Sequence, residues 1–424
     1  MVELNFNPGD YVKLRLAMKE IEGRVLESEN SDILMLKLNS GYNIGINKEN
    51  ILDGKVVRRF RDLRETFELP KSKELKNIGL IVTGGTIASK LDPRTGGVKH
   101  LLGIEEFAKF YPEMFKIANI TRIETPFMIA SESMTWEHWS KIAGVAKDML
   151  NDPSIYGVVI THGTDFLHYT SAALSFMLRE LNKPVVLTYS QRSIDRASSD
   201  ANLNLKCAAK MAIEDCAEVM LVGHANMDDE YCYALKGTKV KKLHSSRRDA
   251  FKPINVRPIA KIFSDNIKFI GEYRPRNNGK VELDNNFSDK VALVKFYPGQ
   301  DASILDFYAL KHKGIIVEGS GLGHLPVSEA GHSWLNGLKK HIRNGFVVCV
   351  TTQTTFGRVD PYVYSNGREL EDAGVIFLED MLSETALVKL GWILGHYGWK
   401  KNVKEKMLEN FAGEFNERLG MDFL

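Results

Sequence analysis

Residues 78–89 read IGLIVTGGTIAS, and this stretch decides the fold. Ile78–Val82 is a continuous apolar run, which is typical of a strand buried on both faces of a parallel sheet. Gly84 and Gly85 follow at once and allow a sharp turn with close backbone approach to a bound group. The turn then presents the hydroxyl of Thr86. Because open α/β sheets bind ligands at the carboxyl ends of their strands, this turn is a candidate site.

Further apolar runs alternate with helical stretches downstream and predict βαβ units with a parallel sheet. The predicted strands are Gly157–Ile160, Pro184–Thr188 and Glu218–Val222, and the predicted helices are Thr135–Leu150, Phe166–Leu181 and Ala201–Glu214. Thr135 is the expected N-cap of the first helix. The polar, Asn-rich stretch Val256–Asp289 indicates a domain boundary.

A second, smaller α/β segment follows this boundary. Its predicted strands are Val291–Phe296, Gly314–Glu318, Phe346–Thr351 and Gly374–Leu378, and its predicted helices are Pro326–Arg343, Ser383–Leu394 and Val403–Phe415. We therefore expect a larger α/β domain over residues 77–270 that carries the site, and a smaller C-terminal α/β domain over residues 290–424.

The first 70 residues have a different pattern, with short β-rich runs separated by Gly, Asn, Ser and Asp. These runs are Tyr11–Leu14, Ile21–Glu27, Ile33–Leu38 and Tyr42–Ile46. Such spacing predicts a small antiparallel β-barrel over residues 1–70, and modules of this kind usually dock or bind. The charge-rich stretch Arg58–Lys76 is expected to be a linker.

Composition excludes several classes of protein. The chain has 424 residues, with 56 basic and 54 acidic side chains, so a nucleic-acid partner would need a local basic patch. No apolar run reaches the roughly 18 residues of a membrane span. The first residues contain neither a basic region nor an apolar region, so we expect no secretory leader, and the four cysteines form no CxxC pair. We expect a cytoplasmic protein with reduced thiols, no structural metal and no membrane contact.

A second motif, VVITHGTD at residues 158–165, again places small and hydroxyl residues after a strand. Taken alone, Thr164 and Asp165 could simply cap the next helix. His162 and His168 lack a third partner for a metal. Together with the first motif, however, the two threonines can face one pocket if their strands are neighbours. A threonine hydroxyl becomes a nucleophile only when a base takes its proton, and a carboxylate with a lysine can provide that base.

The basic run KVKKLHSSRR at residues 239–248 admits three interpretations. It could be a solvated surface or a phosphate-binding patch. Alternatively, Lys242 could turn inward and serve as a buried base, for which it would have to be neutral when it acts.

The motifs TGGTIA and THGTD, in this order and each at a strand end, resemble the bacterial-type L-asparaginase/glutaminase family over about Asn77 to Phe415. The resemblance implies a two-domain fold with sites near a homodimer contact. It implies that Thr86 is the nucleophile, which attacks a side-chain amide and forms an acyl-enzyme. Thr164 would be a second catalytic threonine, supported by Lys242 and Asp165.

The same resemblance implies the substrate contacts. Asp165 would hold the α-amino group of the substrate. Residues 129–134, IASESM, are similar to the substrate loop of the family, where Ser131 would contact the α-carboxylate and Glu132 would line the pocket. Gly85 and Gly163 complete the implied substrate-binding positions.

Two segments depart from the pattern of the family. Residues 90–98, KLDPRTGGV, lack the tyrosine of the loop after the nucleophile, where Thr95 could donate a hydroxyl instead. Residues 321–324 read GLGH in place of GNGN, so no functional residue is assigned there.

The N-terminal extension and the segment QRSIDRASSDA at residues 191–201 resemble one branch of this family, the D subunits of archaeal Glu-tRNA(Gln) amidotransferases. The branch implies a glutamine-hydrolysing ligase (EC 6.3.5.-) that hydrolyses glutamine or asparagine and passes ammonia to an E subunit. The E subunit would use ATP and Mg²⁺ to convert Glu-tRNA(Gln) to Gln-tRNA(Gln), so this chain would bind no cofactor. A homodimer within a heterotetramer is implied, with tRNA contacted mainly through the partner.

Two alternatives remain open on the sequence. The chain could be a free-standing L-asparaginase/glutaminase, in which the first 70 residues would be dispensable. It could also be a non-catalytic tRNA-binding scaffold that uses the basic run.

Overall fold

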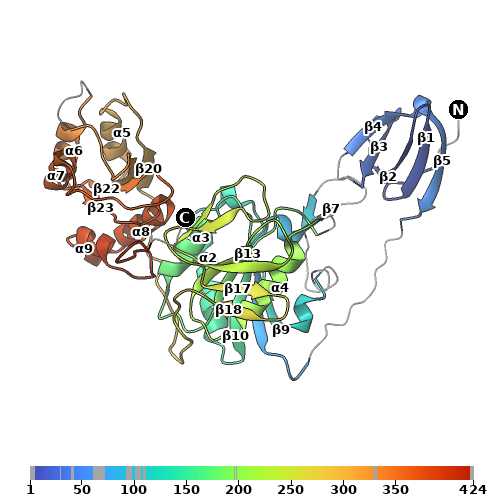
Figure 1. Ribbon diagram of the computed structural model, residues 1–424, viewed down its shortest axis with the longest axis horizontal. Coiled ribbons are helices and arrows are strands. Elements are labelled where there is room, and N and C mark those ends of the chain that lie inside the picture. Colours follow the sequence, from blue (N-terminus) through green and yellow to red (C-terminus); the bar gives the residue numbers. More distant parts are fainter. Residues whose placement is uncertain are drawn as a thin grey trace.

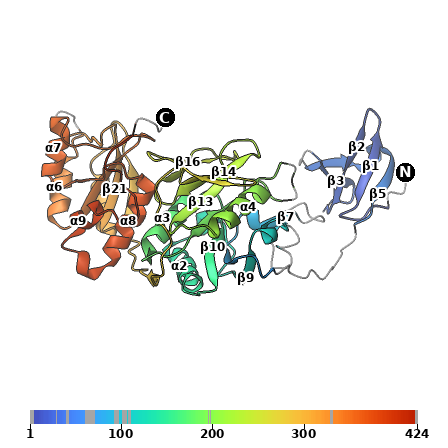
Figure 2. The same ribbon diagram turned by 60° about the horizontal axis from the view of Figure 1, so that its bottom comes forward.

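The computed structural model describes residues 5–28, 30–39, 43–60, 72–91, 98–100, 107, 111–194, 196, 198–327 and 332–420. Three units follow one another in a row (Figure 1). An N-terminal sheet lies at one end, a large α/β domain lies in the middle, and a smaller α/β domain lies at the other end. The second view shows the same arrangement (Figure 2).

The N-terminal unit is an antiparallel sheet with the strand order β4-β3-β2-β1-β5. Its strands are β1 (Tyr11–Leu16), β2 (Glu20–Leu26), β3 (Ile33–Leu38), β4 (Asn43–Asn47) and β5 (Ile51–Arg58). Ile46 of β4 and Ile51 of β5 share one buried cluster with Val12, Leu14 and Leu36. Because strands from both edges bury the same core, the sheet curls on itself as expected for a small barrel.

The fifth strand lies beyond the four that the sequence predicts, and it begins before the expected linker. The sequence of β5, ILDGKVVR, has a central Asp-Gly-Lys and no clean alternation of apolar residues. Its pairing with β1 contains two register shifts, so backbone hydrogen bonds rather than side-chain pattern define this strand.

The large domain contains an eight-stranded sheet with the order β18-β17-β14-β13-β12-β10-β6-β9. Its strands are β6 (Asn77–Val82), β9 (Asn119–Glu124), β10 (Ile155–Thr161), β12 (Val185–Thr188), β13 (Val219–His224), β14 (Tyr231–Lys236), β17 (Ala260–Phe263) and β18 (Ile267–Phe269). The first five are parallel, and the sequence predicts four of them, β6, β10, β12 and β13, but not β9. The last three are antiparallel, and β17 and β18 lie inside the stretch that was expected to be a boundary.

Helices cover both faces of this sheet. They are α2 (Trp136–Leu150), α3 (Leu167–Met177) and α4 (Ala201–Ala212). Val158 and Ile160 belong to the buried cluster that contains residues of α2 and α3, whereas Val159 belongs to the cluster that contains residues of α4. This alternation follows from the two-residue repeat of a strand and accounts for the continuous apolar runs. Thr135 is the N-cap of α2, as predicted.

The chain order creates a topological switch point in the large sheet. The chain leaves β6 to form β9 on one side of it and then returns to form β10 on the other side. The crevice at the carboxyl ends of β6 and β10 is therefore the expected place for a ligand. Both threonine motifs follow these two strands directly.

Short strand pairs and turns complete the large domain. They are β7 (Ser89–Leu91) with β8 (Val98–His100), β11 (Leu178–Arg179) with β19 (Glu282–Leu283), β15 (Val240–Lys242) with β16 (Phe251–Pro253), and the 3₁₀ turns η2 (Thr86–Ala88), η3 (Met114–Lys116) and η4 (Ser131–Ser133). A further turn, η1 (Lys48–Asn50), belongs to the N-terminal unit.

The small domain has a four-stranded parallel sheet with the order β20-β21-β22-β23. Its elements are β20 (Val291–Lys295), α5 (Ile304–Lys311), β21 (Gly314–Gly319), α6 (Leu335–Arg343), β22 (Val347–Thr352), α7 (Ser365–Asp372), β23 (Ile376–Phe377), α8 (Ser383–Gly395), η5 (Tyr397–Trp399) and α9 (Val403–Leu408). Helices α5 and α7 were not predicted.

Two predicted helices of the small domain are shorter in the structure. Helix α6 begins only at Leu335, and α9 ends at Leu408 rather than at Phe415. After α9 the chain turns because both carboxylate oxygens of Glu414 accept backbone N–H groups, from Phe411 and Ala412. Glu414 also forms a buried ion pair with Lys389 of α8. None of the helices among the described residues combines the length and the apolar character that crossing a bilayer requires.

The small and large domains share one hydrophobic core. Phe176 of α3 stacks on Trp392 of α8, with ring centroids 5.6 Å apart. The cluster of buried residues that contains both rings extends from strand β10 of the large sheet to strand β22 of the small sheet. The two domains therefore form one packed body, and this bears on the candidate site below.

Asp10 links the two ends of the N-terminal unit by hydrogen bonds. We therefore expect substitution of Asp10 to destabilise this unit. Its carboxylate accepts from the backbone N–H of Asn7 and of Phe60 and pairs with Arg59 at 2.9 Å. Replacing the buried Asp10 with Ala removes these three hydrogen bonds at once and should lower the local free energy of unfolding by about 1–3 kcal/mol. Hydrogen exchange of the β1 and β2 amides measures this loss. Asp53→Ala is the control, since Asp53 is exposed, and equal protection in the Asp10→Ala variant and the wild type would contradict the prediction.

Candidate active site

The two threonine motifs meet at the carboxyl edge of the large sheet. The backbone N–H of Thr83 donates to the Thr161 carbonyl at 3.2 Å, and the Thr83 hydroxyl donates to the same oxygen at 2.8 Å. These bonds continue the β6–β10 pairing past the strand ends. The turn that presents Thr86 and the turn that presents Thr164 therefore begin side by side.

Glycines let three backbone segments touch at this point. Gly84 and Gly85 have φ values of 124° and 80°, a region that side chains other than glycine rarely adopt. A Cβ on Gly85 would lie 2.6 Å from Gly163 Cα, and one on Gly84 would lie 2.5 Å from the Ile129 carbonyl oxygen. A Cβ on Gly163 would lie 3.1 Å from the Ser131 hydroxyl oxygen. The TGGT turn, the THGT turn and the 129–134 segment are thus in direct contact, and a Cβ at Gly84 or Gly85 would collide with backbone atoms.

Thr86 and Thr164 flank this contact, because each follows one of the touching glycines. Thr86 is the first residue of η2 and is half-buried, as is Thr164. The Ser89 hydroxyl donates to the Gly85 carbonyl at 2.8 Å and so holds the η2 turn closed. Both hydroxyls therefore come from rigid backbone turns rather than from a free loop.

Lys242 reaches the second motif from strand β15. Its Nζ donates to Thr164 Oγ1 at 2.9 Å and to Asp165 Oδ1 at 2.7 Å. The Lys242 side chain is 9% exposed, whereas Asp165 is 62% exposed. An amine, a hydroxyl and a carboxylate thus form one hydrogen-bonded chain that opens to solvent at Asp165. This is the grouping that can activate a threonine hydroxyl.

Ser131 and Glu132, the two residues expected in the substrate loop, differ in their burial. Ser131 is buried, and its Oγ accepts from the backbone N–H of Phe166 at 3.3 Å. Ser131 therefore fixes the start of α3 next to Asp165. Glu132, on η4, is exposed. The structure brings Ser131, Gly85, Gly163, Thr164, Asp165 and Lys242 together, and it leaves Glu132 exposed next to Ser131.

The two histidines of the second motif are buried. His162 Nδ1 lies 2.7 Å from the Gly163 carbonyl and Nε2 lies 2.9 Å from the Thr170 hydroxyl. Burial lowers the pKa of His162 and of His168 to about 4, so both rings are neutral near pH 7. Among the described residues, no three His, Cys, Asp or Glu side chains gather as a metal site would require.

Three family models match consecutive parts of the chain. "GatD N-terminal domain" matches residues 6–57, "Asparaginase, N-terminal" matches residues 77–274, and "Glutaminase/Asparaginase C-terminal domain" matches residues 290–407. The D subunit of the glutamyl-tRNA(Gln) amidotransferase of Pyrococcus furiosus is 48% identical over 96% of this chain and 94% of its own length. The corresponding protein of Methanococcus maripaludis is 42% identical over 98% of this chain and 99% of its own length.

The chain belongs to the family of glutamyl-tRNA(Gln) amidotransferase D subunits. This confirms the resemblance that the two threonine motifs and the N-terminal extension indicate.

Solved structures support the same fold for part of the chain. The thermostable L-asparaginase from Thermococcus kodakarensis is 32% identical, with a TM-score of 0.71, and covers 81% of this chain and all of its own. L-asparaginase I from Vibrio cholerae is 29% identical, with a TM-score of 0.68, over 81% of this chain and 99% of its own. The asparaginase-like two-domain fold is therefore confirmed.

The basic run at residues 239–248 is exposed only over residues 243–247, and it is not an unpaired phosphate patch. Each of its five lysine and arginine side chains has a carboxylate partner. The pairs are Lys239–Asp380, Lys241–Glu384, Lys242–Asp165, Arg247–Asp249 and Arg248–Asp229. Lys239 is buried completely. The run therefore offers little free positive charge, which removes the observation that motivated a tRNA-binding scaffold.

Sequence reasoning missed a buried polar network that holds the family-specific segment 191–201 through Asp200. Asp200 accepts from the backbone N–H groups of Gln191 and Arg192, and Asn204 donates to the Tyr189 carbonyl. His224 Nδ1 lies 2.6 Å from Asn204 Oδ1. These groups shape the chain that leaves β12, the strand next to β10. The Asp200–Asn204 spacing of one helical turn is a weak signal that such a network exists.

The tyrosine-free segment 90–98, including Thr95, lies outside the described residues except for the backbone of β7 and of Val98. The GLGH segment lies in the small domain, where the His324 ring packs edge-on against Tyr364 at 5.3 Å.

A methyl group at Gly85 should separate the two motif turns. Gly85→Ala places a Cβ 2.6 Å from Gly163 Cα, so the turns must move apart and ammonia release should fall steeply. Gly299→Ala is the matched control, because Gly299 also has a positive φ, of 83°, but open space around its Cβ position. Steady-state ammonia release by both variants measures the effect. Equal activities would show that the close approach does not matter.

The buried histidines predict a loss of stability in acid. The unfolded chain binds protons at histidine below about pH 6.5, whereas folded His162 and His168 stay neutral down to about pH 4. The unfolded state therefore binds more protons in this window, and stability falls as pH is lowered through it. His162→Gln should flatten the slope by up to about 1.4 kcal/mol per pH unit. Urea unfolding at pH values across the window measures it, and an unchanged slope would contradict the assignment.

Proposed function

We propose that this chain releases ammonia from glutamine or asparagine through a threonine acyl-enzyme and supplies it to a partner subunit that amidates Glu-tRNA(Gln). The observation that carries the proposal is the hydrogen-bonded group of Lys242, Thr164 and Asp165, beside the turn that presents Thr86. The similarity to proteins named as D subunits of glutamyl-tRNA(Gln) amidotransferases supports the tRNA-dependent part.

The substrate binds through its two charged ends. Asp165 offers its exposed carboxylate to the α-ammonium group, since Oδ1 accepts from Lys242 and Oδ2 remains for the ligand. The buried Ser131 and the backbone at Gly85 and Gly163 line the substrate site next to Asp165. The exposed Glu132 lines its solvent-facing side. An opposite charge at Asp165 favours an amino acid over a simple amide.

The first chemical step forms an ester. Neutral Lys242 and Thr164 act together as the base, the Thr86 oxygen attacks the amide carbon, and the C–N bond breaks with a proton delivered to the leaving ammonia. Backbone N–H groups of the turn at Gly84 and Gly85, where both φ angles are positive, stabilise the oxyanion in this proposal. Water then attacks the ester, returns the proton to Thr86 and releases the acid. No cofactor enters these steps.

The partners belong to the same proposal. An E subunit uses ATP and Mg²⁺ to activate the tRNA-bound glutamate and accepts the ammonia, and two copies of this chain form a homodimer within a heterotetramer in the cytoplasm. The tRNA is contacted mainly through the E subunit, which agrees with the carboxylate pairing of every lysine and arginine in the run at residues 239–248.

Ammonia release with and without the partner tests this proposal. Thr86→Ala should abolish release from both amino acids, and Lys242→Met should lower kcat by about 10²–10⁴-fold, the range typical of a lost general base. Thr121→Ala, at an exposed position of β9, is the control. Release should rise when the E subunit, Glu-tRNA(Gln) and ATP are added.

Two outcomes would overturn parts of the proposal. Full activity of Thr86→Ala would exclude the acyl-enzyme at this residue. Wild-type release that is indifferent to the partner would favour a free-standing amidase, the alternative that the likeness to whole L-asparaginase structures keeps open.

A further inference from the structure

The short hairpin β15–β16 carries Lys242 and lies between the two domains. Strand alternation gives it two faces. Val240 and Phe251 are buried in the core of the large domain, and Lys242 on the same face reaches Thr164. Lys239 and Lys241 point to the other face, where each meets a carboxylate of the small domain.

The Lys239–Asp380 pair is fully buried. Its N–O distance is 2.6 Å, both side chains are 0% exposed, and Lys239 Nζ also donates to the Asp380 carbonyl at 2.9 Å. Asn416 donates to both oxygens of the Asp380 carboxylate, from its backbone N–H at 2.9 Å and from Nδ2 at 2.6 Å. Moving Lys239 away from Asp380 would leave a buried charge without its partner, which is strongly unfavourable. The pair therefore holds the two residues, and the backbone that carries them, in fixed positions.

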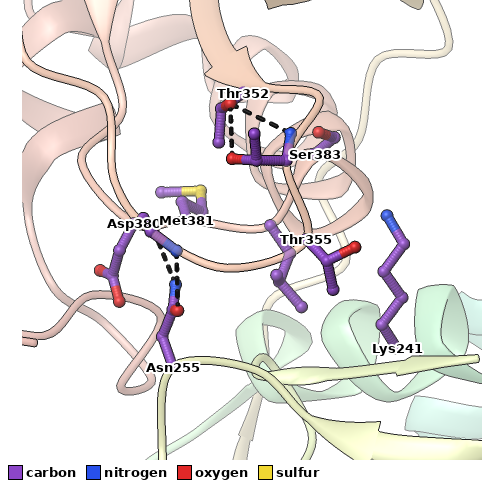
Figure 3. Close-up of a pocket in the computed structure, with 10 residues that line it drawn as sticks. Lys241, Asn255, Thr352, Thr355, Asp380, Met381 and Ser383 are labelled. Carbon is purple, nitrogen blue, oxygen red and sulfur yellow. Dashed lines mark hydrogen bonds between the residues drawn. The ribbon is translucent and has the colours of Figure 1, made fainter. Parts of the chain in front are cut away.

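Lys241 makes the second ion pair, with Glu384 in the first turn of α8, at 2.8 Å. Figure 3 shows Lys241 rising from the large domain beside Thr355 and Ser383 of the small domain. These residues line a polar pocket between the domains. The Lys241 side chain is 28% exposed and Glu384 12% exposed, so this pair is partly shielded from water and screening.

Neutral hydrogen bonds fix the remaining ends of the hairpin. Asn255, just after β16, donates to the Gly357 carbonyl at 2.9 Å and accepts from the Gly357 N–H at 3.1 Å (Figure 3). Thr385 of α8 donates to the Thr238 carbonyl, just before β15, at 2.9 Å. The small domain therefore holds the hairpin before β15, along β15 and after β16.

We propose that Asp380 and Glu384 are positioning residues for the amide-hydrolysing reaction, and that they hold β15 so that Lys242 stays within hydrogen-bond distance of Thr164. Strand β15 is only three residues long and pairs only with β16 among the described strands, so the large sheet does not fix it by hydrogen bonds. The ion pairs at Lys239 and Lys241 fix it from the opposite side. The small domain thus sets the position of the proposed base without contributing a group to the reaction itself.

Glu384→Gln is the sharpest test, because it removes a charge and keeps the shape of the side chain. It should lower kcat for ammonia release by about tenfold to a hundredfold, the cost of misplacing a catalytic group by up to an ångström. KM should stay unchanged, since no substrate contact is altered. Asp306→Asn is the control for loss of a carboxylate charge, because it weakens exposed ion pairs with Lys340 and His341 elsewhere on the small domain.

Exchanging the charges provides a rescue. The double variant Lys241→Glu with Glu384→Lys should recover most of the kcat lost in Glu384→Gln, which a general loss of stability would not allow. Asp380→Asn is the second variant, with a larger expected loss, and near-UV circular dichroism verifies that each variant is folded. An unchanged kcat in folded Glu384→Gln, or no rescue by the exchanged pair, would overturn the inference.

This inference rests on the proposed role of Lys242, and the two can fail separately. If Lys242→Met leaves kcat intact, the proposed base is wrong. If Lys242→Met lowers kcat while folded Glu384→Gln and Asp380→Asn do not, the base stands and the positioning role is wrong.

Discussion

The close backbone approach of Gly85 to Gly163 is the constraint on which the site depends. Two strands that neighbour each other at a topological switch point end in turns, and only glycine lets those turns touch. A side chain at Gly85 would collide with the backbone of Gly163 and push the turns of Thr86 and Thr164 apart. The hydroxyls thus owe their placement to backbone geometry, which is stiffer than a pair of side chains on loops and suits a reaction that needs fixed distances.

The proposed base, Lys242, comes from a part of the chain far from both motifs. Lys242 belongs to the hairpin β15–β16, which is not part of the large sheet. The small domain contacts this hairpin through two ion pairs and through hydrogen bonds to backbone groups. The shared core around Phe176 and Trp392 fixes the two domains relative to each other, so the contacts between the small domain and the hairpin are maintained. In the proposed mechanism, the large domain supplies the reacting groups and the small domain supplies their alignment.

The sequence was sufficient for the parts of the fold that rest on local pattern. Continuous apolar runs identified β6, β10, β12 and β13, because strands buried on both faces must be apolar throughout. It failed for β14, β17 and β18, which are antiparallel strands toward one edge of the sheet with charged or polar residues, and for β5 with its central Asp-Gly-Lys. Within the site, the glycines and threonines of the two motifs could be predicted from the sequence, whereas Asp380, the partner of Lys239, could not. Asp380 lies 141 residues away from Lys239, and no local pattern encodes such a contact.

Peptide mapping of the enzyme, quenched in acid during turnover of glutamine, tests the threonine acyl-enzyme most directly. Nucleophilic attack by Thr86 predicts a glutamyl ester on the peptide that contains this residue, and no ester in the Thr86→Ala variant. An adduct on Thr164 instead, or turnover by the wild type with no adduct on either threonine under conditions where ester hydrolysis limits the rate, would contradict it.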